Sequence, residues 1–288
     1  SNLVDLRSID ALKESITDKT RAVYFESPVN PTLEMIDIEA VRRVVDEVNK
    51  KRAEDRQLYI VVDNTFATPF CQRPIELGAH VVVHSLTKNI GGYGTDMGGA
   101  VIGPHDLEGQ VLLYRKDFGG ALAPKSAWPI LVYGLPTLPL RLKRQMETSY
   151  EVARYLEGHP MVARVVYPGL ENYPQRALAK KQMRSPDGSF TPGNMIYFET
   201  VEENAAEPEN NIKVVDWIAK HAYTMTLAVS LGQLRTLIEN PGAMTHAAVP
   251  AEKRIEGGIA PNGVRISIGV ESAEDIIRDF EKAFEQAK

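Results

Sequence analysis

A lysine and two hydroxyl residues follow an apolar run in the first half of the chain. Ser85 and Thr87 precede Lys88 by three positions and one position in VVHSLTKNIGG, so one short turn can bind an anion through hydroxyl and backbone N–H groups. Asp63 follows a second apolar run. Pyridoxal phosphate needs such a set: an amine for its Schiff base, a carboxylate beside its protonated ring nitrogen, and donors for its phosphate. These residues therefore predict a site for this cofactor, with Lys88 as its covalent anchor.

Each of these residues also has a plain structural explanation. An Asp-Asn-Thr sequence after a strand is commonly a turn or a helix cap, and a lone lysine is usually a solvated charge. His84 fits a structural histidine better than a base, and Cys71 fits core packing better than a nucleophile. The joint placement of Asp63, Ser85 and Lys88 at neighbouring strand ends is what favours a functional site.

The elements that must position these residues alternate between helices and short strands. Strands are predicted at four apolar runs, over residues 21–25, 58–62, 80–83 and 98–102. Helices are predicted between or before them, over residues 9–16, 34–51 and 75–78. This alternation is typical of βαβ units and a parallel sheet. Because ligands bind at the carboxyl ends of such strands, the polar residues after each run are expected to meet there.

The second half of the chain predicts a smaller α/β domain. A helical stretch begins near Trp128 and is interrupted early by Pro136 and Pro139, because proline is excluded from helix interiors. Further strands are predicted over residues 194–200, 226–230 and 264–270, and an amphipathic helix over residues 273–287. We therefore predict an α/β protein with part of a large cofactor-binding domain over residues 1–127. A linking helix and a small C-terminal domain are predicted over residues 128–288.

Composition argues against several classes of protein and partner. The 288 residues carry a net charge of −5, which disfavours nucleic-acid and anionic-membrane partners, because those bind clustered Lys and Arg. No apolar run reaches the about 20 residues that span a bilayer, and no signal segment is recognisable, so we expect a cytoplasmic location. Cys71 is the single cysteine, and we expect no metal site. The glycines from Gly91 to Gly99 lead into a strand, which argues against a dinucleotide-binding loop.

Five ordered motifs resemble those of the pyridoxal-phosphate-dependent Cys/Met metabolism (transsulfuration) enzymes. They are ESPVNPT, VVDNTFATPF, HSLTKNIGGYG, SLGQLRTLIENPGAMTHAAVP and VRISIGVE, and the resemblance runs from about Thr20 to the C-terminus. The family includes methionine γ-lyase, cystathionine γ-lyase, cystathionine γ-synthase and O-acetylhomoserine sulfhydrylase. The resemblance implies the aminotransferase-like fold type I, with a parallel-rich sheet and helices on both of its faces. It also implies a small sulfur amino acid as the substrate.

The resemblance implies a role for each residue at the strand ends. Lys88 would bind the cofactor covalently and then move protons between carbons of the substrate. Asp63 would pair with the ring nitrogen, while Ser85 and Thr87 would hold the phosphate. Asn30 would lie near the ring oxygen of the cofactor and the carboxylate of the substrate.

Further motif positions concern the substrate. Arg265 would bind the substrate carboxylate, which suits a planar guanidinium with paired donors, and Ser230 and Thr245 would help to place the substrate and the arginine. Val229 stands where cystathionine γ-lyases tend to carry a glutamate, and an apolar residue there suits methionine or an acylated homoserine. The resemblance therefore favours γ-elimination on methionine, giving a thiol, ammonia and 2-oxobutanoate. Cystathionine γ-lyase activity, and γ-replacement as in O-acetylhomoserine sulfhydrylase or cystathionine γ-synthase, are the alternatives.

The family pattern also includes an N-terminal portion that this chain lacks. That portion carries a further phosphate-binding turn, a tyrosine that stacks on the cofactor, and a Tyr-x-Arg pair that reaches the neighbouring subunit. Family members are homotetramers built as dimers of dimers with shared sites, so the resemblance implies the same assembly here. A catalytically inert fragment or interaction module is an alternative of another class. The intact set of Asp63, Lys88 and Arg265 favours the enzyme.

Overall fold

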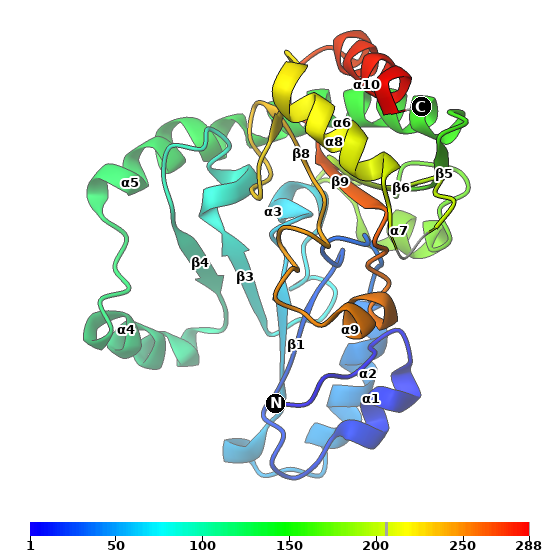
Figure 1. Ribbon diagram of the computed structural model, residues 1–288. Helices are drawn as coiled ribbons and strands as arrows, with labels where there is room; N and C mark the ends of the chain where they lie inside the picture. The colour runs from blue at the N-terminus through cyan, green and yellow to red at the C-terminus, as the bar shows by residue number, and fades with distance from the viewer. Residues whose placement is uncertain (205–206, 288) are drawn as a thin grey trace.

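The computed structural model describes residues 1–204 and 207–287, which contain two β-sheets (Figure 1). The first sheet has the order β1-β2-β3-β4, with β1 (Ala22–Glu26), β2 (Tyr59–Asp63), β3 (Val81–Ser85) and β4 (Gly99–Ile102). The first three strands are parallel, and β4 is antiparallel to β3. All four were predicted as strands. Because the first three run the same way, their carboxyl-terminal residues Glu26, Asp63 and Ser85 lie at the same end of the sheet.

Helices α1 (Ile9–Ser15) and α2 (Ile38–Asn49) pack against the first sheet. In α2, Ile38, Val41 and Val45 recur at a spacing of three or four residues and are fully buried, so they form one apolar face of the helix. Asp37 begins this helix by accepting a hydrogen bond from the backbone N–H of Ala40 at 2.9 Å. The helix thus fixes one face of the sheet and leaves the carboxyl ends of the strands free for the site.

The connection before β3 and the segment after β4 differ from the prediction. A short helix α3 (Thr68–Cys71) follows β2, and the helix predicted over residues 75–78 is wrong. This segment is a single turn, because Gly78 adopts a φ of +101° that a continuing right-handed helix does not allow. After β4, α4 (Glu108–Asp117) and α5 (Pro124–Pro129) extend to one side of the sheet (Figure 1).

The long helix α6 (Leu135–Glu157) packs with residues of both halves of the chain and contains both prolines that were expected to interrupt a helix. Pro136 lies in the first turn, where its missing N–H needs no acceptor. Pro139 lies inside the helix, yet close enough to its start that nearby carbonyls find other donors, as when Arg141 donates to Gly134 at 2.8 Å. The expected interruption was therefore wrong. The domain boundary after residue 127 stays a prediction, and α5 crosses it.

The second sheet has the order β5-β6-β9-β8-β7. Its strands are β5 (Val162–Val166), β6 (Met195–Thr200), β7 (Met225–Leu227), β8 (Thr236–Glu239) and β9 (Gly263–Ser267). Only the pairing of β7 with β8 is parallel among the pairings of this sheet in the described residues. Strands β6, β7 and β9 were predicted, whereas β5 and β8 were not.

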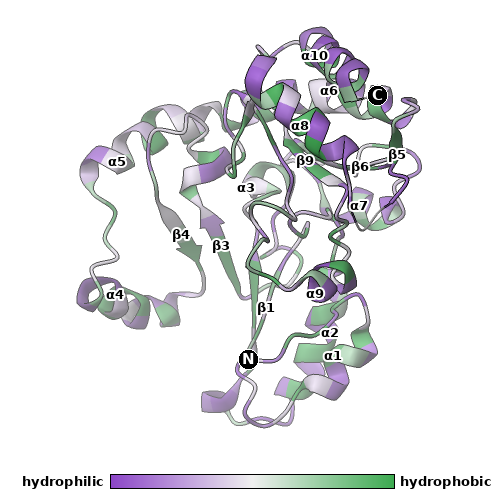
Figure 2. Cartoon of the chain, in the orientation of Figure 1, coloured by the Kyte–Doolittle hydropathy of each residue, from purple (hydrophilic) through white to green (hydrophobic). Residues whose placement is uncertain are grey.

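The second half of the chain also contains the helices α7 (Arg176–Gln182), α8 (Asn210–His221), α9 (Ala251–Glu256) and α10 (Ala273–Ala287). The predicted amphipathic pattern of α10 is confirmed, because Ile276, Phe280 and Phe284 are buried in the core of this half. The outer side of α10 is largely hydrophilic (Figure 2). Within residues 1–204 and 207–287, no helix is both long and apolar enough to cross a membrane.

Candidate active site

Most of the predicted site residues line one cavity, which lies where the two sheets meet. Its volume is about 280 Å³. Of the eight predicted residues, six line it, namely Asn30, Asp63, Ser85, Lys88, Thr245 and Arg265. The strand ends of the first sheet supply the lysine and the first carboxylate, and β9 of the second sheet supplies the arginine. The structure therefore brings residues from both halves of the chain to one place.

Lys88 lies in the turn Leu86–Ile90 that directly follows β3. Its Nζ donates a hydrogen bond to the hydroxyl of Ser230 at 3.2 Å. Burial lowers the pKa of Lys88, and the positive charge of Arg265 lowers it further, while Glu239 opposes this effect. The amine is therefore closer to its neutral form than an exposed lysine, as a nucleophile or base requires.

Asp63 ends β2 with both carboxylate oxygens hydrogen-bonded. The backbone N–H of Thr65 donates to Oδ1 at 2.9 Å, and the phenol of Tyr24 donates to Oδ2 at 3.2 Å. Burial, followed by the charge of Asp63, raises the pKa of Tyr24 to about 12, so the phenol remains a donor at neutral pH. Sequence reasoning missed Tyr24, although its position two residues before the end of β1 places it on the same face of the sheet as Glu26.

The two predicted phosphate ligands are placed differently. Ser85 ends β3 and lines the cavity, and its backbone N–H donates to the hydroxyl of Thr65 at 2.9 Å. The hydroxyl of Thr87 instead accepts a hydrogen bond from the backbone N–H of Gly98 at 3.0 Å. The structure therefore brings the side chain of Ser85 into the cavity, while Thr87 fastens the turn to the segment before β4.

Glu26 ends β1 and Asn30 lies in the segment that follows, and both line the cavity. The backbone N–H of Asn30 donates to the carboxylate of Glu26 at 3.2 Å. Burial raises the pKa of Glu26, and the negative charge of Asp63 adds to the rise. Because Glu26 lies directly opposite Asp63 in the parallel pairing, two carboxylates share this end of the sheet.

Arg265 lies in the middle of β9 with a side chain only 2% exposed. Its Nη1 donates to Oδ1 of Asn30 at 2.9 Å and forms an ion pair with Oε1 of Glu239 at 2.9 Å. Its Nη2 donates to the carbonyls of Val229 at 3.1 Å and Ser230 at 3.0 Å. These bonds hold the guanidinium in one orientation at the wall of the cavity.

Glu239 is a further residue of this group that sequence reasoning missed. It ends β8, its side chain is 1% exposed, and its Oε1 accepts a hydrogen bond from the hydroxyl of Thr245 at 3.0 Å. Burial raises the pKa of Glu239, and Arg265 offsets part of that rise. Thr245 therefore contacts Glu239, and Glu239 in turn pairs with Arg265. A carboxylate in the short apolar run TLIE is the signal that could have identified it, because buried carboxylates need a partner.

The chemistry of these donors fits pyridoxal phosphate. The amine of Lys88, the carboxylate of Asp63 and the hydroxyl of Ser85 line the same cavity. The aldehyde of the cofactor needs an amine, its ring nitrogen needs a carboxylate, and its phosphate needs a donor. Among the described residues, no group of three His, Cys, Asp or Glu side chains is placed to bind a metal ion. The arrangement can attach a carbonyl compound, transfer protons and bind a carboxylate.

Comparisons with known proteins point to the same chemistry. The sequence model of the family "Cys/Met metabolism PLP-dependent enzyme" matches residues 1–285. The chain is 38% identical to cystathionine beta-lyase of Lactococcus lactis subsp. cremoris (strain MG1363), over 99% of this chain and 69% of the relative. It is 39% identical to L-methionine gamma-lyase of Fusobacterium nucleatum subsp. polymorphum, over 98% of this chain and 67% of the relative. The crystal structure of cystathionine gamma-lyase from Lactobacillus plantarum complexed with L-serine matches with a TM-score of 0.86 and 34% identity, over 99% of this chain and 69% of that one.

Proposed function

Because the chain belongs to the pyridoxal-phosphate-dependent enzymes of Cys and Met metabolism, we propose that it cleaves the carbon–sulfur bond of methionine. The predicted family, cofactor and fold type I are confirmed by the family match and by the solved relative. The proposed reaction is a γ-elimination that yields a thiol, ammonia and 2-oxobutanoate. The observation that carries this proposal is the cavity that Lys88, Asp63, Ser85 and Arg265 share.

Five residues are proposed to hold the cofactor, and among them Asn30, which lines the cavity, would lie near its ring oxygen. Lys88 would attach to its aldehyde, and Asp63 would keep its ring nitrogen protonated, a role supported by the fixed position of the Asp63 carboxylate. Ser85 would contact the phosphate from the end of β3. Thr87 would support this contact by holding the turn, because its hydroxyl is engaged with Gly98.

The proposed proton transfers depend on Lys88. Pyridoxal phosphate, when bound, supplies an electron sink beside the α carbon of the substrate. Lys88 would take a proton from the α carbon and move protons at the β carbon, and its lowered pKa supports this role as a base. The hydroxyl of Ser230, 3.2 Å from the amine, would keep it directed into the cavity between transfers.

Arg265 is the proposed site for the substrate carboxylate. Its orientation is fixed by two side chains and two carbonyls, and its Nε is buried without a hydrogen-bond partner in the described part of the chain. Val229 lines the same cavity. Its isopropyl group offers no partner for a second ammonium group, which supports methionine over cystathionine as the substrate.

A second candidate is a cystathionine lyase. It is favoured by the relative named cystathionine beta-lyase, which is 38% identical over 99% of this chain. Lyase activity on cystathionine would use the same base and the same carboxylate site. Only the contacts to the distal half of the substrate would differ.

The test begins with borohydride reduction of the purified protein, followed by peptide mass mapping. A phosphopyridoxyl group on Lys88 is expected, and release of 2-oxo acid from methionine, cystathionine and O-acetylhomoserine then ranks the substrates. Methionine should be cleaved fastest, whereas faster cleavage of cystathionine would favour the second candidate. An unmodified Lys88 after pyridoxal phosphate is supplied would instead support the inert-fragment alternative.

The family resemblance also supports a homotetramer with sites shared between subunits and a cytoplasmic location. Light scattering coupled to size-exclusion chromatography tests the assembly. A monomeric species with full activity would contradict the sharing of sites.

A further inference from the structure

Most N–H groups of the Arg265 guanidinium already donate to acceptors of the protein before a substrate binds. An arginine side chain has five N–H groups. Its two Nη atoms donate to Asn30 and to the carbonyls of Val229 and Ser230, and Nη1 also forms an ion pair with Glu239. Nε is the nitrogen that has no partner among the described residues. A substrate carboxylate must therefore compete with the acceptors that are already present.

Glu239 differs from the other acceptors because it carries a formal negative charge. Asn30 offers an amide oxygen, and Val229 and Ser230 offer backbone carbonyls. The Glu239 carboxylate lies 2.9 Å from Nη1, with both side chains almost fully buried. Opposite charges attract strongly where water is excluded, so Glu239 neutralises much of the positive charge that would otherwise attract a substrate carboxylate.

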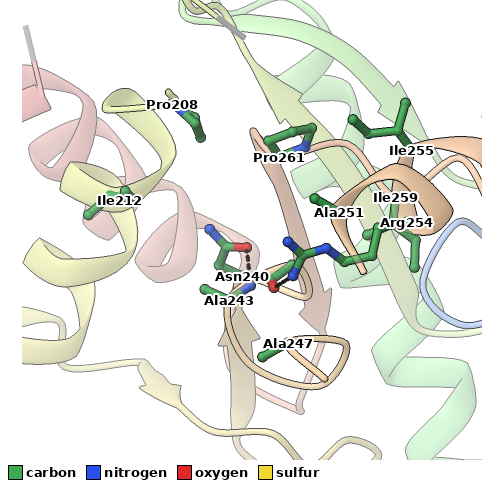
Figure 3. A pocket seen from close by; sticks show the side chains of 11 residues that line it. Pro208, Ile212, Asn240, Ala243, Ala247, Ala251, Arg254, Ile255, Ile259 and Pro261 are labelled. Carbon is green, nitrogen blue, oxygen red and sulfur yellow. Dashed lines mark hydrogen bonds between the residues drawn. The ribbon is translucent and has the colours of Figure 1, made fainter. Parts of the chain in front are cut away.

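The segment after β8 keeps Glu239 in place. The side chain of Asn240 accepts a hydrogen bond from the backbone N–H of Ala243 at 3.1 Å, and Arg254 donates to the carbonyl of Gly242 (Figure 3). These two contacts close the loop behind Glu239. The carboxylate is therefore presented to Arg265 by a fixed strand end and a fastened loop.

We propose that Glu239 is a positioning residue that competes with the substrate carboxylate for Arg265 and thereby limits the affinity for the amino acid. The inference rests on the proposed function, because it takes Arg265 as the carboxylate site. Glutamine at position 239 keeps an acceptor for Arg265 but removes the competing charge. A carboxylate that arrives in such a variant meets an arginine whose charge is not neutralised.

The first experiment titrates the holoenzyme with L-alanine, which has the amino and carboxylate groups but no substituent to eliminate. Binding is followed through the visible absorbance of the cofactor. The Kd should fall about tenfold in Glu239→Gln, and the KM for methionine should fall with it while kcat stays within about twofold. An unchanged or raised Kd in this variant overturns the proposal.

The matched control is Glu199→Gln. Glu199 belongs to β6 of the same sheet, its side chain is 18% exposed, and it pairs with Arg164 at 3.6 Å. The control variant therefore carries the same Glu-to-Gln change in a partly buried ion pair, and Glu199 does not line the cavity. The Kd for L-alanine should not change in this variant, and an equal fall in both variants overturns the proposal.

A second experiment needs no cofactor, so that a failure of the proposed function remains distinguishable. The Tm of the cofactor-free chain is measured in sodium acetate and in sodium chloride at equal ionic strength. Acetate should raise the Tm more in Glu239→Gln than in the wild type, because a ligand that binds only the folded state stabilises it, and should have no such effect in Arg265→Leu. If Lys88 fails to bind pyridoxal phosphate, the proposed function fails. An equal acetate effect in the wild type and Glu239→Gln separately overturns the role of Glu239.

Discussion

The amine of Lys88 lies 3.2 Å from the hydroxyl of Ser230, although 142 residues separate them in the chain. Lys88 follows β3 of the first sheet, and Ser230 lies between β7 and β8 of the second. The carbonyl of Ser230 also accepts a hydrogen bond from Arg265 at 3.0 Å. One residue of the second sheet therefore contacts both the proposed base and the proposed carboxylate site.

Replacing Lys88 with methionine should stabilise the cofactor-free protein at neutral pH. Folding lowers the pKa of Lys88 through burial, so between that lowered pKa and 10.5 the unfolded chain binds more protons than the folded one. The stability of the wild type therefore rises with pH across this window, and Lys88→Met lacks that dependence. Thermal melts between about pH 7 and pH 10 should show a difference in Tm that shrinks as the pH rises. A difference that does not vary with pH would contradict the lowered pKa, and the exposed Lys125→Met serves as the control.

Replacing Arg265 with lysine should weaken substrate binding while the positive charge is kept. Lysine cannot supply donors in the planar arrangement that reaches Asn30, Glu239 and the backbone carbonyls together. We expect the KM for the preferred amino acid to rise by about tenfold or more, since the loss of one hydrogen bond to a charged group removes about 1.5 kcal/mol or more. Steady-state kinetics measures this, with Arg164→Lys on β5 as the control. An unchanged KM would remove Arg265 from the substrate site.

Replacing Asp63 with asparagine should reduce kcat without preventing attachment of the cofactor to Lys88. Asparagine keeps an oxygen for the N–H of Thr65 but loses the charge proposed to face the ring nitrogen. Loss of one preorganised electrostatic partner lowers kcat by about 10²–10³-fold. Borohydride reduction should still label Lys88 in this variant. Asp46→Asn on α2 is the control, and a fully active Asp63→Asn would show that this carboxylate has no role in the reaction.

The sequence was sufficient to predict the first sheet and the residues at its carboxyl end. Continuous apolar runs identified β1, β2 and β3, and parallel strands necessarily bring Asp63 and Ser85 to one end. The orientation of Thr87 was not predictable in the same way. Its hydroxyl turns toward Gly98 because the segment leading into β4 passes beside the turn, and that approach depends on tertiary structure.

The strand that carries the partner of Arg265 was also missed, because its local pattern is not typical of a strand. Strand β8 is short, and its run TLIE ends in a carboxylate, so it resembles neither an alternating strand nor an apolar one. It becomes a strand because β9 pairs with it, with Glu239 directly opposite Arg265. This pairing also makes the charge of Glu239 tolerable in the core, since the two side chains neutralise each other.

Replacing Glu26 with glutamine should stabilise the cofactor-free protein at neutral pH. Burial and Asp63 raise the pKa of Glu26 on folding, so the stability that this group contributes is fully present below 4.5 and is lost as the pH rises through the raised value. Glutamine avoids that loss and keeps an acceptor for the N–H of Asn30. Urea unfolding between about pH 4 and pH 8 should show a gain over the wild type that grows with pH. The exposed Glu47→Gln on α2 should show no such gain, and equal pH profiles for the wild type and Glu26→Gln would contradict the prediction.

Replacing Gly232 with alanine should destabilise the protein and disturb the site together. Gly232 has a φ of +75°, and an added Cβ would lie 2.8 Å from Cα of Asn89, the residue that follows Lys88. The left-handed conformation alone costs about 1–2 kcal/mol in the free energy of unfolding, and the close approach adds to it.

Gly188→Ala is a matched control, because its φ is +84° but no heavy atom lies within 4 Å of an added Cβ. Urea unfolding should therefore show a larger loss for Gly232→Ala than for Gly188→Ala. The KM should rise only in Gly232→Ala, since Ser230 precedes Gly232 by two residues and holds Arg265 through its carbonyl. Equal losses of stability with an unchanged KM would show that the approach of Gly232 to Asn89 does not position the site.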